Sequence, residues 1–197
     1  MWKDDQQHGD GVENWVEGAK YEGTYVLGLK DGKGKYTYAD GSIYDGQWYV
    51  NKIDGYGSQT WADGKAYYGQ WSDNDMSGYG MYQYADKVRY DGQFNADKKE
   101  GFGVYKWTDG RLYEGYWYKG KQHGFGIYHS NKSEQPPKHG LWENGKRVKW
   151  FNEDEIKVIQ KGMDSKELKE HFNNAESANA LPNKCSFEKP PGWDAEI

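Results

Sequence analysis

The feature that most constrains this chain is a 23-residue period. The triplet Tyr-x-Gly begins at five positions with this spacing, which are Tyr21, Tyr44, Tyr67, Tyr90 and Tyr113. A Gly-x-Gly pair follows each triplet in the same register, and an earlier pair before residue 12 also keeps it. Periods of about 20 to 50 residues are typical of proteins that stack one small unit many times. The chain is therefore predicted to be an elongated array of units.

Within one unit, the residue pattern has the period of a β-strand. In residues 90–94, Tyr-Asp-Gly-Gln-Phe, the two aromatic residues and the glycine alternate with polar residues and so share one face of a strand. Residues 104–107 alternate in the same way. The polar, glycine-ended segment 95–103 between them is predicted to be a hairpin loop, and Asp109-Gly110 is predicted to turn into the next unit. The predicted fold class is an all-β repeat, an elongated single-layer antiparallel ribbon of stacked β-hairpins.

The core of such a ribbon is predicted to be aromatic. The chain has 18 Tyr, 10 Trp and 6 Phe, and these rings bury enough area to replace the scarce aliphatic residues. A glycine such as Gly92 or Gly103 leaves room for a ring to lie across the backbone. The columns of rings are expected to stack along the ribbon and form its core.

The chain divides into three predicted segments. Residues 1–150 form the ribbon, with a partial first unit, five full units counted from Tyr21 and a degenerate last unit. Residues 151–179 are predicted to be helical, because apolar residues recur at spacings of three and four. Asn152 is expected to cap the first helix, Gly162 to end it, and a second helix to begin near residue 164.

Residues 180–197 are predicted to be an extended docking tail. They contain an apolar and aromatic cluster within an otherwise polar terminus, and segments of this kind often become ordered on a partner. The predicted docking residues are Phe187, Pro190, Pro191 and Trp193.

Several function classes find no support in the sequence. The formal net charge of −5 lies mostly after residue 150, so the ribbon offers no long-range attraction to nucleic acid. The single Cys185 allows no internal disulfide and favours a reducing compartment, and no apolar run suits a signal peptide or a membrane span. The Gly-x-Gly pairs lack the third glycine and the helix of a dinucleotide site. No catalytic residue, metal ligand or cofactor is predicted, and the chain is expected not to be an enzyme.

One column of polar residues is a candidate for an acid–base site. It is predicted to consist of solvated turn residues on exposed loops, since its members lie one repeat apart and cannot converge. The column comprises Asp31, Asp54, Ser77, Glu100 and His123.

The predicted binding surface is an aromatic groove along the ribbon. A single sheet cannot cover both of its faces, and rows of Tyr and Trp are typical of protein-binding surfaces. A helix or an extended segment of a partner is expected to lie on this groove. Its predicted floor consists of Tyr44, Trp48, Tyr67, Trp71, Tyr90, Phe94, Tyr113 and Trp117.

A rival hypothesis is contact with a membrane surface. Clustered basic side chains bind anionic lipid, and the chain has one such cluster, although acidic residues follow it immediately. The cluster comprises Lys138, Lys146, Arg147 and Lys149.

The skeleton Tyr-x-Gly-x-Trp, Gly-x-Gly and Asp-Gly at this period resembles the MORN repeat over residues 2–150. Gln59 departs from the pattern by replacing an aromatic residue, and Asp86-Lys87 lacks the turn glycine. The resemblance implies a non-catalytic scaffold for protein partners in the cytoplasm, in a ciliary axonemal complex such as a radial spoke or the central apparatus, or elsewhere in the cytoskeleton. Two alternatives remain, a peripheral membrane adaptor that binds acidic phospholipids and a regulatory subunit of a lipid kinase.

Overall fold

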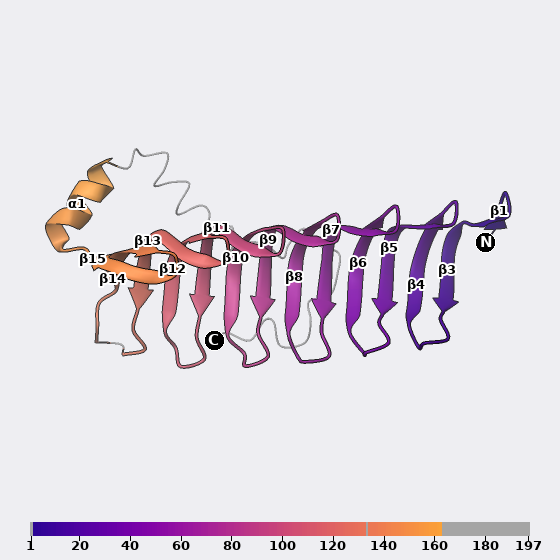
Figure 1. Cartoon of the computed structure of the whole chain (residues 1–197), viewed down its shortest axis with the longest axis horizontal. Helices are drawn as coiled ribbons and strands as arrows, with labels where there is room; N and C mark the ends of the chain where they lie inside the picture. Colours follow the sequence, from indigo (N-terminus) through magenta and orange to yellow (C-terminus); the bar gives the residue numbers. More distant parts are fainter. Residues whose placement is uncertain (1, 133, 163–197) are drawn as a thin grey trace.

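The chain forms one long, open, antiparallel sheet. A computed structural model describes residues 2–132 and 134–162. Thirteen strands, β3 to β15, follow one another in chain order, and each is hydrogen-bonded to its neighbours in the sequence (Figure 1). A separate two-stranded pair precedes them. This architecture confirms the predicted all-β ribbon of stacked hairpins.

The strands are β1 (Trp2–Lys3), β2 (Gln6–Gln7), β3 (Gly9–Asn14), β4 (Lys20–Val26), β5 (Leu29–Thr37), β6 (Ile43–Tyr49), β7 (Lys52–Thr60), β8 (Ala66–Ser72), β9 (Asp75–Gln83), β10 (Arg89–Asn95), β11 (Lys98–Lys106), β12 (Leu112–Tyr118), β13 (Lys121–His129), β14 (Lys138–Glu143) and β15 (Lys146–Trp150), and the helix is α1 (Glu153–Gly162).

The turn between β10 and β11 is shorter than the sequence suggested. Ala96 and Asp97 form it alone, with φ angles of 46° and 62°, the left-handed conformation that matches the twist of a two-residue hairpin. The backbone N–H of Asp97 also donates to the carbonyl of Met76 in the preceding unit, at 3.1 Å. The prediction of a loop over residues 95–103 is wrong, because this tight turn lets β11 begin at Lys98.

The second turn of the unit agrees with the prediction. The backbone N–H of Trp107 donates to the carbonyl of Arg111 at 2.9 Å, and Gly110 has a φ of 86°. Asp109 accepts from the backbone N–H of Arg111 at 3.1 Å. The Asp-Gly pair therefore connects one hairpin to the next.

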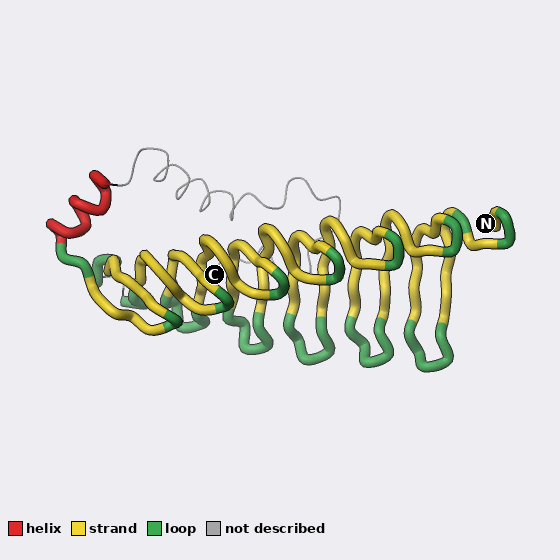
Figure 2. The backbone as a smooth tube through the Cα atoms, turned by 45° about the horizontal axis from the view of Figure 1, so that its top comes forward, coloured by secondary structure: helices red, strands yellow, loops and turns green. Residues whose placement is uncertain are grey.

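Each hairpin is bent at a bulge beside the Gly-x-Gly pair (Figure 2). Gly92 pairs with Gly103 and Phe94 pairs with Lys99, so the register shifts between them. Gly101 lies in this bulge with a φ of 65°, which a residue without Cβ adopts freely. The bend divides the sheet into two arms and gives it an inner and an outer face.

The core lies on the inner face and is built from interlocking rings. Tyr90 is fully buried and meets Phe94 of its own unit and Trp117 of the next, each at 5.2 Å and in edge-to-face geometry. The same pair of contacts joins each unit to the following one from Tyr21 to Trp142. The core is thus a continuous aromatic column, as the sequence predicted.

The helix α1 begins as predicted. Asn152 accepts from the backbone N–H of Glu155 at 2.9 Å, and Glu155 accepts in return from the backbone N–H of Asn152 at 3.1 Å. This reciprocal pair is a capping box. The predicted second helix, the rest of 151–179 and the docking tail 180–197 lie outside the described residues. Within the described ranges, no helix is long and apolar enough to cross a membrane.

Candidate functional site

The predicted groove residues form the buried layer of the inner face. The four tyrosines, Tyr44, Tyr67, Tyr90 and Tyr113, have no exposed surface, and Trp48, Trp71, Phe94 and Trp117 are 6 to 7% exposed. The tyrosines therefore cannot touch a partner directly, because their rings fill the space over the glycines. The surface above them belongs to a second, half-buried aromatic row that the sequence analysis did not assign. This half-buried row, which also lies on the inner face, comprises Trp15, Tyr36, Tyr38, Trp61, Tyr82, Tyr105, Trp107, Tyr128 and Trp150.

The inner face is concave. Lys99 and Tyr105 are six residues apart in β11, which is about 20 Å along a straight strand. The Nζ atom of Lys99 nevertheless lies 4.9 Å from the centre of the Tyr105 ring. The two side chains can meet only because the strand bends toward this face, so both aromatic rows line a trough.

Two units each hold one of their own lysines within a box of four rings. The Nζ atom of Lys30 lies 4.9, 5.2, 4.9 and 5.5 Å from the ring centres of Trp15, Tyr21, Tyr36 and Trp48. Distances of this size give an attraction between the ammonium and the ring faces. Burial lowers the pKa of Lys30, because the rings replace the water that would solvate its charge.

The second box surrounds Lys99. Its Nζ atom lies 5.4, 5.5, 4.9 and 4.6 Å from the ring centres of Tyr84, Tyr90, Tyr105 and Trp117. It also donates a hydrogen bond of 2.8 Å to the hydroxyl of Tyr84. Burial lowers the pKa of Lys99 to about 8, so the side chain is still mostly charged at pH 7.

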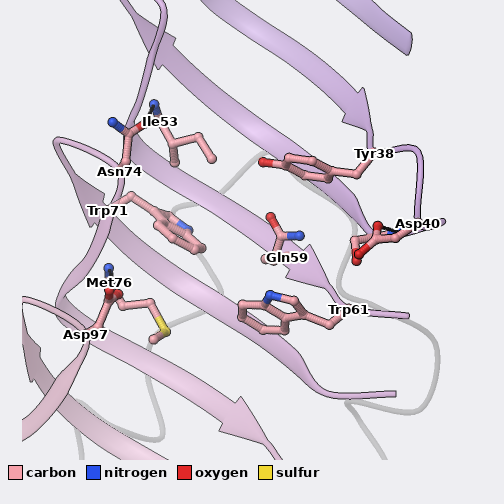
Figure 3. A pocket seen from close by; sticks show the side chains of 10 residues that line it. Tyr38, Asp40, Ile53, Gln59, Trp61, Trp71, Asn74, Met76 and Asp97 are labelled. Atoms are coloured by element: carbon pink, nitrogen blue, oxygen red, sulfur yellow. Dashed lines mark hydrogen bonds between the residues drawn. The ribbon is translucent and has the colours of Figure 1, made fainter. Parts of the chain in front are cut away.

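The two units between these boxes have no lysine at the equivalent position. In the 23-residue register, Ile53 and Met76 occupy the column of Lys30 and Lys99, and Gln59 occupies the column of Tyr36 and Tyr105. A pocket of about 520 Å³ opens here, over strands β7 to β9 and beside the turn between β5 and β6 (Figure 3). It is lined by Tyr38, Asp40, Ser42, Ile53, Gln59, Trp61, Trp71, Asn74, Met76 and Asp97.

Gln59 lies in the middle of this pocket, between Tyr38 and Trp61 (Figure 3). It is 5% exposed, yet its side-chain amide makes no hydrogen bond to another residue in the described part of the chain. The amide faces the open pocket, where water or a ligand can reach it, so it offers both donors and an acceptor to what enters. The signal in the sequence is that Gln59 stands where the neighbouring units have Tyr36 and Tyr82, and the smaller side chain leaves space on the surface.

A smaller pocket of the same kind lies near the end of the ribbon. Gln122 takes the lysine position there, and the pocket of about 280 Å³ includes Trp142 and Trp150. The guanidinium of Arg147 lies 4.5 Å from the centre of the Trp150 ring and forms part of the wall. A cation of the chain itself therefore lines this pocket.

The column of polar residues from Asp31 to His123 has a structural role. These residues lie in strands and not on loops, because the hairpin turns are so short. Glu100 accepts from the backbone N–H of Lys119 at 2.9 Å, and Asp54 accepts from that of Asp73 at 3.1 Å. Each such carboxylate fastens the turn of the next unit. Among residues 2–132 and 134–162, no group of three or more metal-ligating side chains occurs.

The predicted basic cluster lies on the last hairpin, in β14 and β15. Lys149 pairs with the carboxylate of Glu155, and Lys138 lies 5.8 Å from the centre of the Trp150 ring. Lys146, Arg147 and Lys149 lie in β15, the edge strand of the sheet, and charged side chains on an edge disfavour pairing with other strands. Contact of this cluster with lipid stays a prediction. The predicted docking residues of the C-terminal tail, Phe187, Pro190, Pro191 and Trp193, lie outside the described residues.

Comparison with known families identifies the repeat. The model of the MORN repeat matches residues 1–20, 21–43, 44–66, 67–89, 90–110 and 113–133. The chain belongs to the MORN repeat family. Four of the matched MORN units begin at the tyrosines from Tyr21 to Tyr90 and a fifth begins at Tyr113, where the sequence pattern placed them. The family match supports a non-catalytic protein-interaction module.

Two solved structures are distantly similar to this MORN-repeat chain. One is the SAS-4 (dCPAP) TCP domain in complex with a proline-rich motif of Ana2 (dSTIL) of Drosophila melanogaster, with 12% identity, a TM-score of 0.42, and coverage of 68% of this chain and 72% of that chain. Another is the wild-type TCP10 domain of Danio rerio CPAP, with 14% identity, a TM-score of 0.41, and coverage of 73% and 68%. These TM-scores are too low to bear on function. The comparison with curated proteins gave no match.

Proposed function

We propose that this MORN-repeat chain is a non-catalytic scaffold that holds protein partners in a large cytoskeletal assembly. The proposed setting is a ciliary axonemal complex such as a radial spoke or the central apparatus. In this proposal residues 1–150 bind one partner, residues 151–179 form a helical connection, and residues 180–197 bind a second partner.

The observation that carries this proposal is the half-buried aromatic row along the inner trough. Adjacent strands lie about 4.8 Å apart, so thirteen strands extend for roughly 58 Å. Rings such as Trp61 and Trp107 offer large contact area along this length, and trough-shaped apolar surfaces suit a helix or an extended segment. The buried row from Tyr44 to Trp117 supports the surface from below.

The proposal is tested by fractionating ciliated source cells that express the tagged chain. Extraction with non-ionic detergent and then with 0.5 M salt should leave the chain in the axonemal or cytoskeletal pellet, where crosslinking identifies what it touches. Release by detergent together with membrane proteins would contradict the scaffold and favour the lipid adaptor. Sedimentation with vesicles of anionic phospholipid is the direct test of that alternative.

A pair of variants connects this result to the trough. W107A removes a half-buried ring of the inner face without emptying the buried core, so it should move the chain from the pellet into the soluble fraction. Y118A removes an exposed ring from the next strand, on the opposite face, and should leave the chain in the pellet. Equal behaviour of the two variants would show that the inner face does not hold the partner.

A further inference from the structure

We propose that the pocket around Gln59 binds the side-chain ammonium of a lysine that belongs to a partner protein. This inference rests on the proposed function, because the lysine reaches the pocket from the segment that lies in the trough. It adds the chemistry by which one particular place of the trough recognises its partner.

The chain itself shows what its aromatic boxes accept. The boxes around Lys30 and Lys99 each place one primary ammonium within 4.6 to 5.5 Å of four ring centres. The ammonium lies over the faces of the rings in each case, at the end of its four-carbon stem. The same architecture therefore binds a lysine side chain twice within this chain.

The central units repeat this architecture without its lysine. By the 23-residue register, the box at Ile53 has Tyr38 and Trp71 at the positions that Trp15 and Trp48 occupy around Lys30. Replacing the lysine by Ile53 and an aromatic ring by Gln59 leaves an open pocket of about 520 Å³, bounded by rings whose equivalents in other units contact a lysine. The space is suited to a lysine that enters from outside.

The charges around the pocket favour a cation. Asp40 and Asp97 are both exposed and both line the pocket, and no lysine or arginine is among its lining residues. One lysine lies beside the wall of the pocket: the Nζ of Lys65 is 5.9 Å from the centre of the Trp61 ring and 2.8 Å from Asp63. Asp63 balances that charge, so two carboxylates remain to attract a ligand.

The free amide of Gln59 selects among ammonium groups. A primary ammonium donates hydrogen bonds, as Lys99 does to the Tyr84 hydroxyl, and the side-chain carbonyl of Gln59 offers an acceptor inside the pocket. A trimethylated ammonium has no N–H to donate and would leave that amide unsatisfied. Unmodified lysine is therefore the expected occupant.

The direct test uses the full chain and a small probe. The chain is labelled with ¹⁵N, and the indole signals of Trp61 and Trp71 are followed by NMR during titration with Nα-acetyl-lysine N-methylamide. Saturable shifts with a Kd of about 1 mM are expected for a ligand of this size. Burial is the only cause of the lowered pKa of Lys99, whereas this open pocket has the carboxylates of Asp40 and Asp97, so the norleucine analogue, which lacks the ammonium, should give no saturable shift. Equal binding of norleucine or of the trimethyl-lysine analogue, or the absence of saturation by lysine, would overturn the proposal.

Two variants locate the binding. I53K/Q59Y rebuilds in the middle of the array the side chains that surround Lys30, so it should fold and abolish binding by filling the pocket. D97N keeps the oxygen that accepts from the backbone N–H of Met76, as Asn74 does for Ile53, but it removes one charge. It should weaken binding about two- to five-fold. Unchanged binding in both variants would place the probe elsewhere.

The same variants separate this inference from the proposed function. I53K/Q59Y should release the chain from the cytoskeletal pellet under milder salt than the wild type requires. If this variant loses the lysine probe but stays in the pellet at every salt concentration, the scaffold stands and the inference fails. If the wild type itself is absent from the pellet, the scaffold proposal fails, whatever the probe does.

Discussion

The ring of Tyr90 lies directly over Gly103, and a Cβ built on that glycine would lie 2.5 Å from the Cζ atom of the ring. The two residues stand in different strands of one hairpin, and the Tyr90 hydroxyl donates to the carbonyl of Gln93 at 3.0 Å. This hydrogen bond and the rings on both sides keep the tyrosine in place. Glycine is therefore required at position 103 by the ring, since its backbone has no positive φ.

Substitution of this glycine tests how rigid the aromatic column is. G103A should destabilise the chain by about 3 kcal/mol, because a fully buried ring or the β10–β11 pairing must shift to admit the methyl group. G11A is the matched control, since its Cβ would meet the Tyr25 ring at 3.2 Å and needs only a small displacement. Thermal unfolding followed by circular dichroism compares the two. Equal midpoints for both variants would show that the Tyr90 ring moves freely.

The other glycine of the pair is required for a different reason. Gly101 has a φ of 65° in the bulge, while Gly103 lies under a ring. The space that a ring needs correctly predicts the glycine at position 103. The segment around Gly101 was wrongly predicted to be a loop, because a polar, glycine-ended segment resembles a loop more than a bulged strand. The periodicity therefore predicted the hairpins and the core, and it missed the bend.

The missed bend also explains why the candidate site was incomplete. In a flat ribbon the rings at positions 44 to 117 would be the exposed floor of a groove. In the bent sheet these rings are buried, and the exposed surface of the inner face is formed by the half-buried row that includes Trp61 and Tyr105. The lysine column of Lys30 and Lys99 was visible at the 23-residue period. The aromatic box around each lysine could not be predicted from this period, because its rings come from several parts of the chain that meet only after folding.

The column of buried tryptophans already contains one smaller ring, that of Phe94. Phe94 already takes the position that Trp71 occupies in the preceding unit, and both meet Tyr67 edge to face at 5.1 to 5.2 Å. W71F should therefore cost about 1 to 2 kcal/mol, through the lost hydrogen bond from Nε1 to the Gly57 carbonyl and the smaller buried area. W71A should cost about 3 to 5 kcal/mol by opening a cavity. Urea unfolding measures both, and a cost for W71F as large as that for W71A would contradict the shared role of the two rings.

The capping box of α1 makes a local prediction. N152A removes the side-chain oxygen that accepts from the backbone N–H of Glu155, and it should destabilise the first turn of the helix by about 1 kcal/mol. Hydrogen exchange measured by mass spectrometry should show faster exchange over residues 153–162 and unchanged protection in β3 to β13. N152D retains an acceptor and should preserve the protection. Faster exchange throughout the sheet in N152A would mean that the helix supports the ribbon as a whole.

Lys99 gives the stability of the ribbon a defined dependence on pH. Its pKa is about 8 in the folded chain and near 10.5 when the chain is unfolded, so between these values the unfolded state binds more protons. Stability must then rise with pH across this window, by up to about 3 kcal/mol, while below pH 8 the full penalty for burying the charge is present. K99M places at this position the residue that the preceding unit has at Met76, and it removes the penalty.

The free energy of unfolding of K99M should therefore exceed that of the wild type at pH 7, and the difference should shrink as the pH approaches 10.5. Taking the difference at each pH cancels the ionisation of the tyrosines, which both proteins share. Lys52 is the control with the opposite sign, because its pairing with Asp73 raises its pKa. The advantage of the wild type over K52M should therefore be present at pH 7 and decline at high pH. A constant difference between the wild type and K99M would show that the four rings attract the Lys99 ammonium as strongly as water does.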